Sequence, residues 1–223
     1  MGIGHLAVGL ASKRWAPRAS LGWLVLAPVF IDMLWSVFIL VGIEHARIVP
    51  GITKAMPLDL QYIGISHSLV GATGWGILLG GVYFALHKDR RAALVLFVGV
   101  ISHFLLDWIS HGPDMPILPN GPRVGLGLWN YPVPALLVEV ALVLGGLALY
   151  MRTTRPRAAG SSTWLFVLVG VLLMINVGAY FGPPPPSIEP MAALNLSTLL
   201  VVFFFARIDR QRELRPVYQA QLT

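Results

Sequence analysis

Residues 21–43 read LGWLVLAPVFIDMLWSVFILVGI, a run of 23 residues in which Asp32 is the single charged side chain. A helix needs roughly 20 mostly apolar residues to cross the hydrocarbon core of a bilayer. This stretch therefore predicts a membrane-spanning helix. Its one carboxylate lies about halfway along, where an ionisable group is costly and suggests a functional site.

Five more apolar stretches of similar length follow, so the sequence predicts six spanning helices. Of the 223 residues, 56% are hydrophobic and 12% are charged, whereas soluble domains average about 25% charged residues. We therefore expect an all-α fold: a multi-pass transmembrane helix bundle forming one domain over residues 1–206, followed by a basic cytoplasmic tail at 207–223. The expected helices cover about residues 21–43, 64–86, 92–110, 131–151, 163–181 and 190–206.

The distribution of basic residues predicts how this bundle is oriented. Lys and Arg accumulate in the cytoplasmic loops of membrane proteins. Segments 1–20, 87–91, 152–162 and 207–223 together hold 13 of the 16 Lys and Arg residues. Both termini are therefore predicted to be cytoplasmic. The net charge of +6 comes from these clusters, so no nucleic-acid partner is expected.

A short apolar segment, residues 2–12, precedes the first expected span. At about 1.5 Å per residue, a helix of this length covers roughly half of a hydrocarbon core and cannot cross it. It either lies along the membrane interface or rises into the bundle as a short N-terminal half-helix shielded by protein. The second arrangement places His5 near mid-membrane.

Ionisable side chains within the expected spans suggest a shared site. With a rise of about 1.5 Å per residue they fall at compatible depths, from the middle of the bilayer towards its non-cytoplasmic side. The absence of cysteine leaves His, Asp and Glu as the ligands for any metal. These side chains are Asp32, His67, His103, Asp107 and Glu139.

His103 and Asp107 are four residues apart, and His111 follows after four more, so all three lie on one helical face. Imidazole and carboxylate are suitable ligands for zinc and related divalent metals. The same spacing also suits a simple ion pair or hydrogen bond. Spacing alone leaves both interpretations open.

The remaining three side chains also have structural alternatives. Asp32 lies in an apolar setting, which favours a bound cation, a proton-relay role, or a neutral carboxyl hydrogen-bonded to a neighbouring helix. His67 lies between two serines whose hydroxyls can orient a ligand imidazole, or it is an ordinary interfacial residue. Glu139 either joins the site or is neutralised by a partner elsewhere. The candidate partners are Arg123, His111 and Asn176.

Six short motifs follow one another along the chain: Gly4-His5, Pro28 with Asp32, Ser66-His67-Ser68, His103-x-x-x-Asp107, Leu128-Trp129 and Glu139. In this order they resemble the bacterial membrane-bound, predicted metal-dependent hydrolase family, which is distantly similar to zinc-dependent phospholipase C. The resemblance covers roughly residues 1–145. The chain departs from the family pattern at Leu34 and Trp35, where Asp and His are often found, and at Tyr62 and Ile63.

The resemblance implies a bacterial inner-membrane protein that hydrolyses a phosphodiester or other ester bond in a lipid or lipid-linked substrate. It implies a divalent metal, zinc being the first candidate, with Asp32 or Glu139 as the catalytic base. The implied metal ligands or their immediate partners are His5, Asp32, His67, His103, Asp107 and Glu139.

Two other functions remain open. One is a proton- or cation-coupled transporter that uses the same intramembrane Asp and His residues. The other is a non-catalytic membrane scaffold in which the polar groups only determine helix packing. The sequence contains neither a Walker motif nor a dinucleotide fingerprint, so no nucleotide partner is expected.

Overall fold

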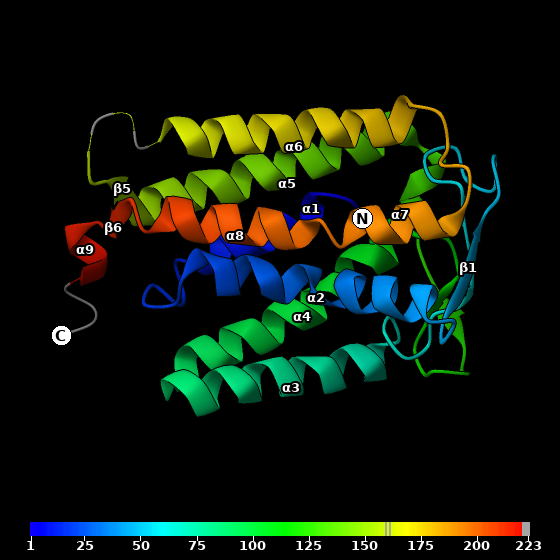
Figure 1. Cartoon of the computed structure of the whole chain (residues 1–223), viewed down its shortest axis with the longest axis horizontal. Helices are drawn as coiled ribbons and strands as arrows, with labels where there is room; N and C mark the ends of the chain where they lie inside the picture. The colour runs from blue at the N-terminus through cyan, green and yellow to red at the C-terminus, as the bar shows by residue number, and fades with distance from the viewer. Residues whose placement is uncertain (159, 161, 220–223) are drawn as a thin grey trace.

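Six long apolar helices run roughly along the long axis of the molecule in the computed structural model, which describes residues 1–158, 160 and 162–219 (Figure 1). Each is long and apolar enough to cross a membrane. The expected all-α, multi-pass bundle is therefore confirmed. The spans are α2 (Leu21–Leu40), α3 (Leu69–His87), α4 (Arg90–Ser110), α5 (Pro132–Thr153), α6 (Thr163–Phe181), and Ile188–Asp209, which consists of α7 (Ile188–Asn195) and α8 (Thr198–Asp209).

Large apolar side chains cover the outside of the bundle. Met174 is 76% exposed, and Ile77, Leu137 and Phe203 are exposed to a similar degree. In water such a surface would promote aggregation, whereas in a bilayer it faces acyl chains of the same polarity. The outer surface is therefore that of a protein embedded in lipid.

Three of the expected helices differ from those observed. The helix predicted over 21–43 ends at Leu40. The helix predicted from residue 64 begins at Leu69, because Ser68 has an extended backbone and its hydroxyl accepts a hydrogen bond from the Gly71 N–H at 2.9 Å. His67 consequently lies in the turn that leads into α3. The helix predicted over 190–206 is longer and is interrupted by a turn at Leu196 and Ser197.

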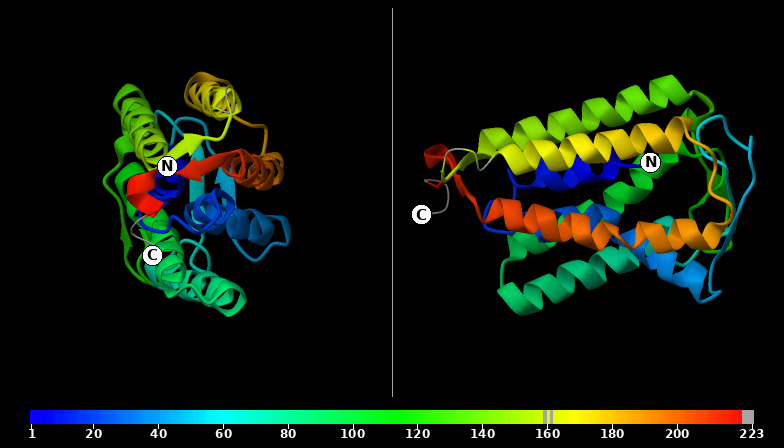
Figure 2. Two further views of the ribbon diagram at one scale, coloured as in Figure 1. Left: turned by 90° about the vertical axis from the view of Figure 1, so that its left-hand side faces the viewer. Right: turned by 45° about the horizontal axis from the view of Figure 1, so that its top comes forward.

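The N-terminal segment rises into the bundle as helix α1 (Gly4–Ser12), so the half-helix alternative is correct and the interfacial one is wrong. Viewed end-on, α1 lies among the other helices (Figure 2), where it contacts α5, α2 and α4. Glycines permit this close approach. A Cβ atom built on Gly146 of α5 would lie 2.5 Å from the Ala7 carbonyl oxygen, and one on Gly9 would lie 2.6 Å from Val25 Cα.

One carboxylate ties α1 to the basic end of the bundle. The Asp209 side chain accepts hydrogen bonds from Lys13 Nζ at 2.7 Å, the Leu21 N–H at 3.0 Å and the Tyr150 hydroxyl at 2.8 Å. Lys13 is buried, so its ammonium group needs this partner. The ends of α1, α2, α5 and α8 are thereby joined.

Short antiparallel hairpins occupy connections that the sequence suggested only as loops. At the end opposite the C-terminus, β1 (His45–Ile48) pairs with β2 (Leu58–Tyr62), and β3 (Met115–Pro116) pairs with β4 (Arg123–Val124). A 3₁₀ turn, η1 (Leu128–Asn130), leads into α5. At the other end, β5 (Thr154–Pro156) pairs with β6 (Arg212–Leu214), and α9 (Pro216–Gln219) follows. Part of the predicted tail thus pairs with the α5–α6 connection.

Neighbouring glycines on α5 test the close contact between α1 and α5. Gly146→Ala should lower the free energy of unfolding by about 1 to 3 kcal/mol, because the added methyl group meets the α1 backbone. Gly145→Ala is the matched control, since a Cβ atom there has no heavy atom within 4 Å. It should be neutral or stabilise the helix by up to about 1 kcal/mol. Thermal unfolding in detergent micelles measures both, and equal effects would contradict the contact.

Candidate functional site

Five ionisable side chains from four parts of the chain meet inside the bundle. His5 comes from α1, Asp32 from α2, His67 from the turn before α3, and His103 and Asp107 from α4. Four of them are buried, while the Asp32 side chain is 30% exposed. Five of the six candidate ligands therefore lie close together in the structure.

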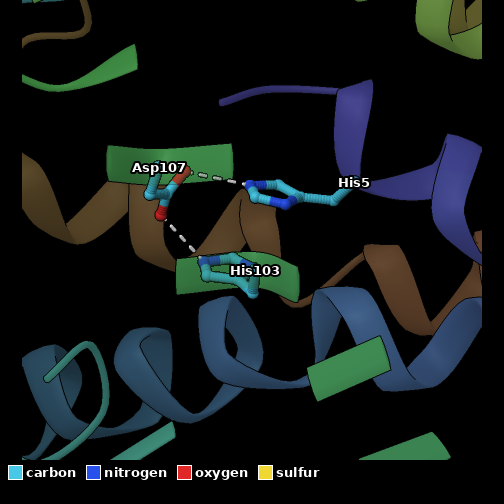
Figure 3. Close-up of side chains that lie close together, drawn as sticks. All are labelled: His5, His103 and Asp107. Atoms are coloured by element: carbon cyan, nitrogen blue, oxygen red, sulfur yellow. Dashed lines mark hydrogen bonds and ion pairs between the residues drawn. The ribbon is translucent and has the colours of Figure 1, made fainter. Parts of the chain in front are cut away.

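Asp107 is in contact with histidines from two helices (Figure 3). Its Oδ1 lies 3.1 Å from His5 Nε2, and its Oδ2 lies 3.0 Å from His103 Nε2. The two imidazole rings stack with centroids 3.9 Å apart. The α-amino group of Met1 also forms an ion pair with Asp107 Oδ1. The Asp107 carboxylate thus contacts three other ionisable groups.

His103 also belongs to a second group of close side chains, together with His67 and Asp32. Its Nε2 lies 3.3 Å from His67 Nε2 and 3.6 Å from Asp32 Oδ1. His67 Nε2 lies 3.5 Å from Asp32 Oδ1 and 3.8 Å from Asp107 Oδ2. Two imidazole nitrogens and two carboxylate oxygens therefore lie close together.

Hydrogen bonds determine the tautomers of both histidines in this group. His103 Nδ1 lies 2.7 Å from the Pro28 carbonyl oxygen, which can only accept, so Nδ1 carries the proton. The Ser66 hydroxyl donates to Glu44 Oε2 at 2.5 Å and accepts from His67 Nδ1 at 2.7 Å. The Nε2 atom of each ring then points to the other ring and to a carboxylate, where it can donate a proton as an imidazolium or bind a cation.

Most of the spacings among these atoms are those of metal ligands. Zinc with ligand bonds of about 2.0 to 2.1 Å places its ligand atoms about 3.3 to 3.4 Å apart. Five of the six distances among His67 Nε2, His103 Nε2, Asp32 Oδ1 and Asp107 Oδ2 range from 3.0 to 3.8 Å. His67 and His103, together with Asp107 or Asp32, could hold a divalent metal. His5 would complete the site through the other oxygen of Asp107.

Glu139, the sixth candidate, belongs to neither of these groups. Its Oε1 accepts hydrogen bonds from the Gly2 N–H and the Tyr180 hydroxyl, both at 2.8 Å, and its Oε2 accepts one from the Gly4 N–H at 3.1 Å. Arg123, one of its expected alternative partners, instead donates to the carbonyl oxygens of residues 60 and 61.

His111 follows the last residue of α4 and has an extended backbone, so it is not on the helical face expected from its spacing, although its side chain still lies near Asp107. Its Nε2 lies 3.9 Å from Asp107 Oδ1, and its Nδ1 lies 3.2 Å from Asp114 Oδ1. The ring packs against Trp129, with centroids 4.0 Å apart. His111 is therefore at the edge of the site, outside the groups that could hold a metal.

Sequence reasoning missed Glu44, which is 1% exposed and supports the turn containing His67. Its Oε1 accepts from the N–H groups of Ile65 and Ser66, each at 2.8 Å. Glu44 lies just beyond the first apolar stretch, where an acidic residue ordinarily contacts water. The serines beside His67 were the available signal, because their hydroxyls suggested an oriented imidazole.

The chain matches one known family over most of its length. Residues 1–181 match the family described as YdjM inner membrane protein. The chain belongs to this family. The match includes every residue of the site and ends with α6, whereas α7 and α8 lie beyond it. Comparisons with curated proteins and with solved structures gave no match.

Family membership places the protein among inner-membrane proteins, in agreement with its six apolar spans. The family description names a location and no reaction. The metal, the hydrolase activity and the similarity to zinc-dependent phospholipase C therefore stay predictions.

Removing the Ser66 hydroxyl tests whether it orients His67. If the centre binds zinc, Ser66→Ala should weaken that binding about 10- to 100-fold, because His67 Nδ1 loses its acceptor and the ring is free to turn. Competition with a chromophoric chelator measures the affinity. Ser102→Ala is the control, since that hydroxyl donates to the Gly99 carbonyl oxygen within its own helix. Equal affinities for the two variants would contradict the orienting role.

Proposed function

We propose that the protein is a membrane-embedded, metal-dependent hydrolase that cleaves a phosphodiester or other ester bond in a lipid or lipid-linked substrate. The observation that supports this most is the convergence of two imidazole nitrogens, 3.3 Å apart, with two carboxylate oxygens beside them. Helix packing alone does not require this arrangement, because ionisable side chains are costly to bury inside a membrane bundle.

His67, His103 and Asp107 would bind the proposed metal, with His5 on the far side of Asp107, which leaves a fourth position for water beside the Asp32 carboxylate. Nitrogen and carboxylate oxygen donors in a tetrahedral arrangement favour zinc. When bound, a divalent metal supplies a Lewis acid that polarises a phosphoryl or acyl oxygen and activates water. The buried carbonyl oxygen of Pro28 and the Ser66–Glu44 pair keep the two imidazoles in the required orientation.

Asp32 is the residue best placed to handle a proton. Its side chain is 30% exposed, whereas the side chains of His67 and Asp107 are 7% and 3% exposed. A substrate therefore approaches the site from the Asp32 side. Glu139 was the other candidate base, but its carboxylate is already occupied by three hydrogen-bond donors. We assign the general-base role to Asp32 alone.

A cation-coupled transporter is the second candidate, and one observation favours it. The span formed by α7 and α8 is interrupted next to Asp32, and the Asn195 amide donates to the Asp32 carbonyl oxygen at 3.2 Å. Discontinuous helices beside intramembrane charges are common at the ion sites of transporters. The two candidates use the same side chains and differ in whether a bond is broken.

Metal content tests the proposed centre directly. Protein purified in detergent should retain about one divalent metal ion per chain by mass spectrometry, and His103→Ala and Asp107→Ala should lose it, because each removes a buried ligand. His45→Ala is the matched control, since His45 lies exposed on β1. Absence of metal from the unaltered protein, or equal content in all four proteins, would exclude the centre.

Activity separates the two candidate functions. The metal-loaded protein should hydrolyse a chromogenic phosphodiester or a phospholipid in mixed micelles, with the rate of Asp32→Asn reduced at least about 100-fold by loss of the base. Flux of protons or cations in proteoliposomes that Asp32→Asn abolishes, without any hydrolysis, would instead identify a transporter.

We also propose that both termini face the cytoplasm, as the basic residues predict. The absence of native cysteine allows single-cysteine labelling. In spheroplasts, a membrane-impermeant maleimide should label Lys54→Cys, in the loop between β1 and β2, and should label Arg91→Cys on α4 only after permeabilisation. Both positions are exposed, so access depends on sidedness alone. The reverse labelling pattern would invert the orientation.

A further inference from the structure

Glu139 carries a buried carboxylate near the middle of α5, between apolar neighbours. No Lys, Arg or His side chain of the described residues forms an ion pair with it, and it takes no part in the groups that could hold a metal. An isolated carboxylate in such surroundings is costly unless strong donors satisfy it. The groups that donate hydrogen bonds to this carboxylate therefore indicate what Glu139 does.

Two of the three donors are backbone N–H groups where α1 begins. Gly2 donates to Oε1 and Gly4 donates to Oε2. The first turn of a helix has N–H groups without intrahelical partners, and α1 has neither a capping side chain nor an acidic residue there. The Glu139 carboxylate of α5 thus accepts hydrogen bonds that a capping side chain ordinarily accepts, at the positive end of the α1 dipole. The Tyr180 hydroxyl holds the same carboxylate from α6.

The segment held in this way carries His5. The His5 residue directly follows Gly4, its Nε2 contacts Asp107, and its ring stacks on His103. Small residues are needed where the segment meets Glu139: a Cβ atom on Gly2 would lie 2.6 Å from Asn176 Oδ1 and 3.1 Å from Glu139 Oε2. A displacement of the α1 terminus would move His5 away from Asp107.

We propose that Glu139 is a positioning residue that docks the N-terminal segment, residues 1–12, on α5 and so delivers His5 to Asp107. It acts through the Gly2 and Gly4 backbone, and it is neither a metal ligand nor a base. Docking of residues 1–12 on α5 needs no bound metal, so this proposal does not depend on the proposed function. Only its consequence for metal affinity rests on that function.

Hydrogen–deuterium exchange of the purified protein in detergent, without added metal, tests the docking. Glu139→Gln should speed exchange within residues 1–12 on the order of tenfold, because the amide cannot accept from both glycines. Glu189→Gln makes the same chemical change at an exposed position and should leave this exchange unchanged.

A second variant leaves Glu139 intact, in case Glu139→Gln does not fold. Gly2→Ala should also speed exchange in residues 1–12, whereas Gly178→Ala, with open space at its Cβ atom, should not. Unchanged exchange in both Glu139→Gln and Gly2→Ala would overturn the proposal.

Zinc affinity distinguishes positioning from ligation. His5→Ala and Glu139→Gln should each weaken binding about tenfold, and the double variant should be no weaker than His5→Ala alone, since both changes remove the same contact. Additive losses would show that Glu139 acts independently of His5 and would overturn the proposal while leaving the metal centre intact. Faster exchange in a protein that binds no zinc would overturn the metal centre and leave the docking intact.

Discussion

The pairing of charged groups in a region of low dielectric is the constraint on which this structure depends. An unpaired ion inside a helix bundle costs several kcal/mol, so each buried carboxylate has to find donors nearby. Asp107 satisfies this requirement with groups from α1 and from its own helix α4. The positions of α1 and α4 are consequently linked by one side chain. Asp209 imposes the same kind of link where α1, α2, α5 and α8 end.

Close helix packing makes this pairing possible. Gly146 lets the α1 backbone approach α5, and Gly99 on α4 faces Ala27 and Pro28 of α2. With larger residues the helices would stand further apart, and a histidine from α1 would no longer reach a carboxylate on α4. Small residues in membrane helices often serve close association. Here their spacing also determines the distances within the polar centre.

Much of the fold could be predicted from local composition, because a span of about 20 apolar residues has few alternatives to a membrane helix. The depth of each ionisable residue followed from helical rise, and this was sufficient to bring Asp32, His67, His103 and Asp107 together. The partners of Glu139 could not be predicted, because they are backbone N–H groups that any sequence possesses. The role of Glu44 could not be predicted for a related reason. A turn buries this residue, and a turn has no distinctive hydropathy pattern.

The position of α1 has a consequence for the order in which the protein is assembled. A nine-residue helix cannot be held by lipid alone, since its first N–H groups and His5 would lack partners there. Those partners reside on α4 and α5, which are synthesised much later than α1. His5 can therefore reach Asp107 only after α4 has been synthesised, so the polar contacts of α1 form later than α1 itself.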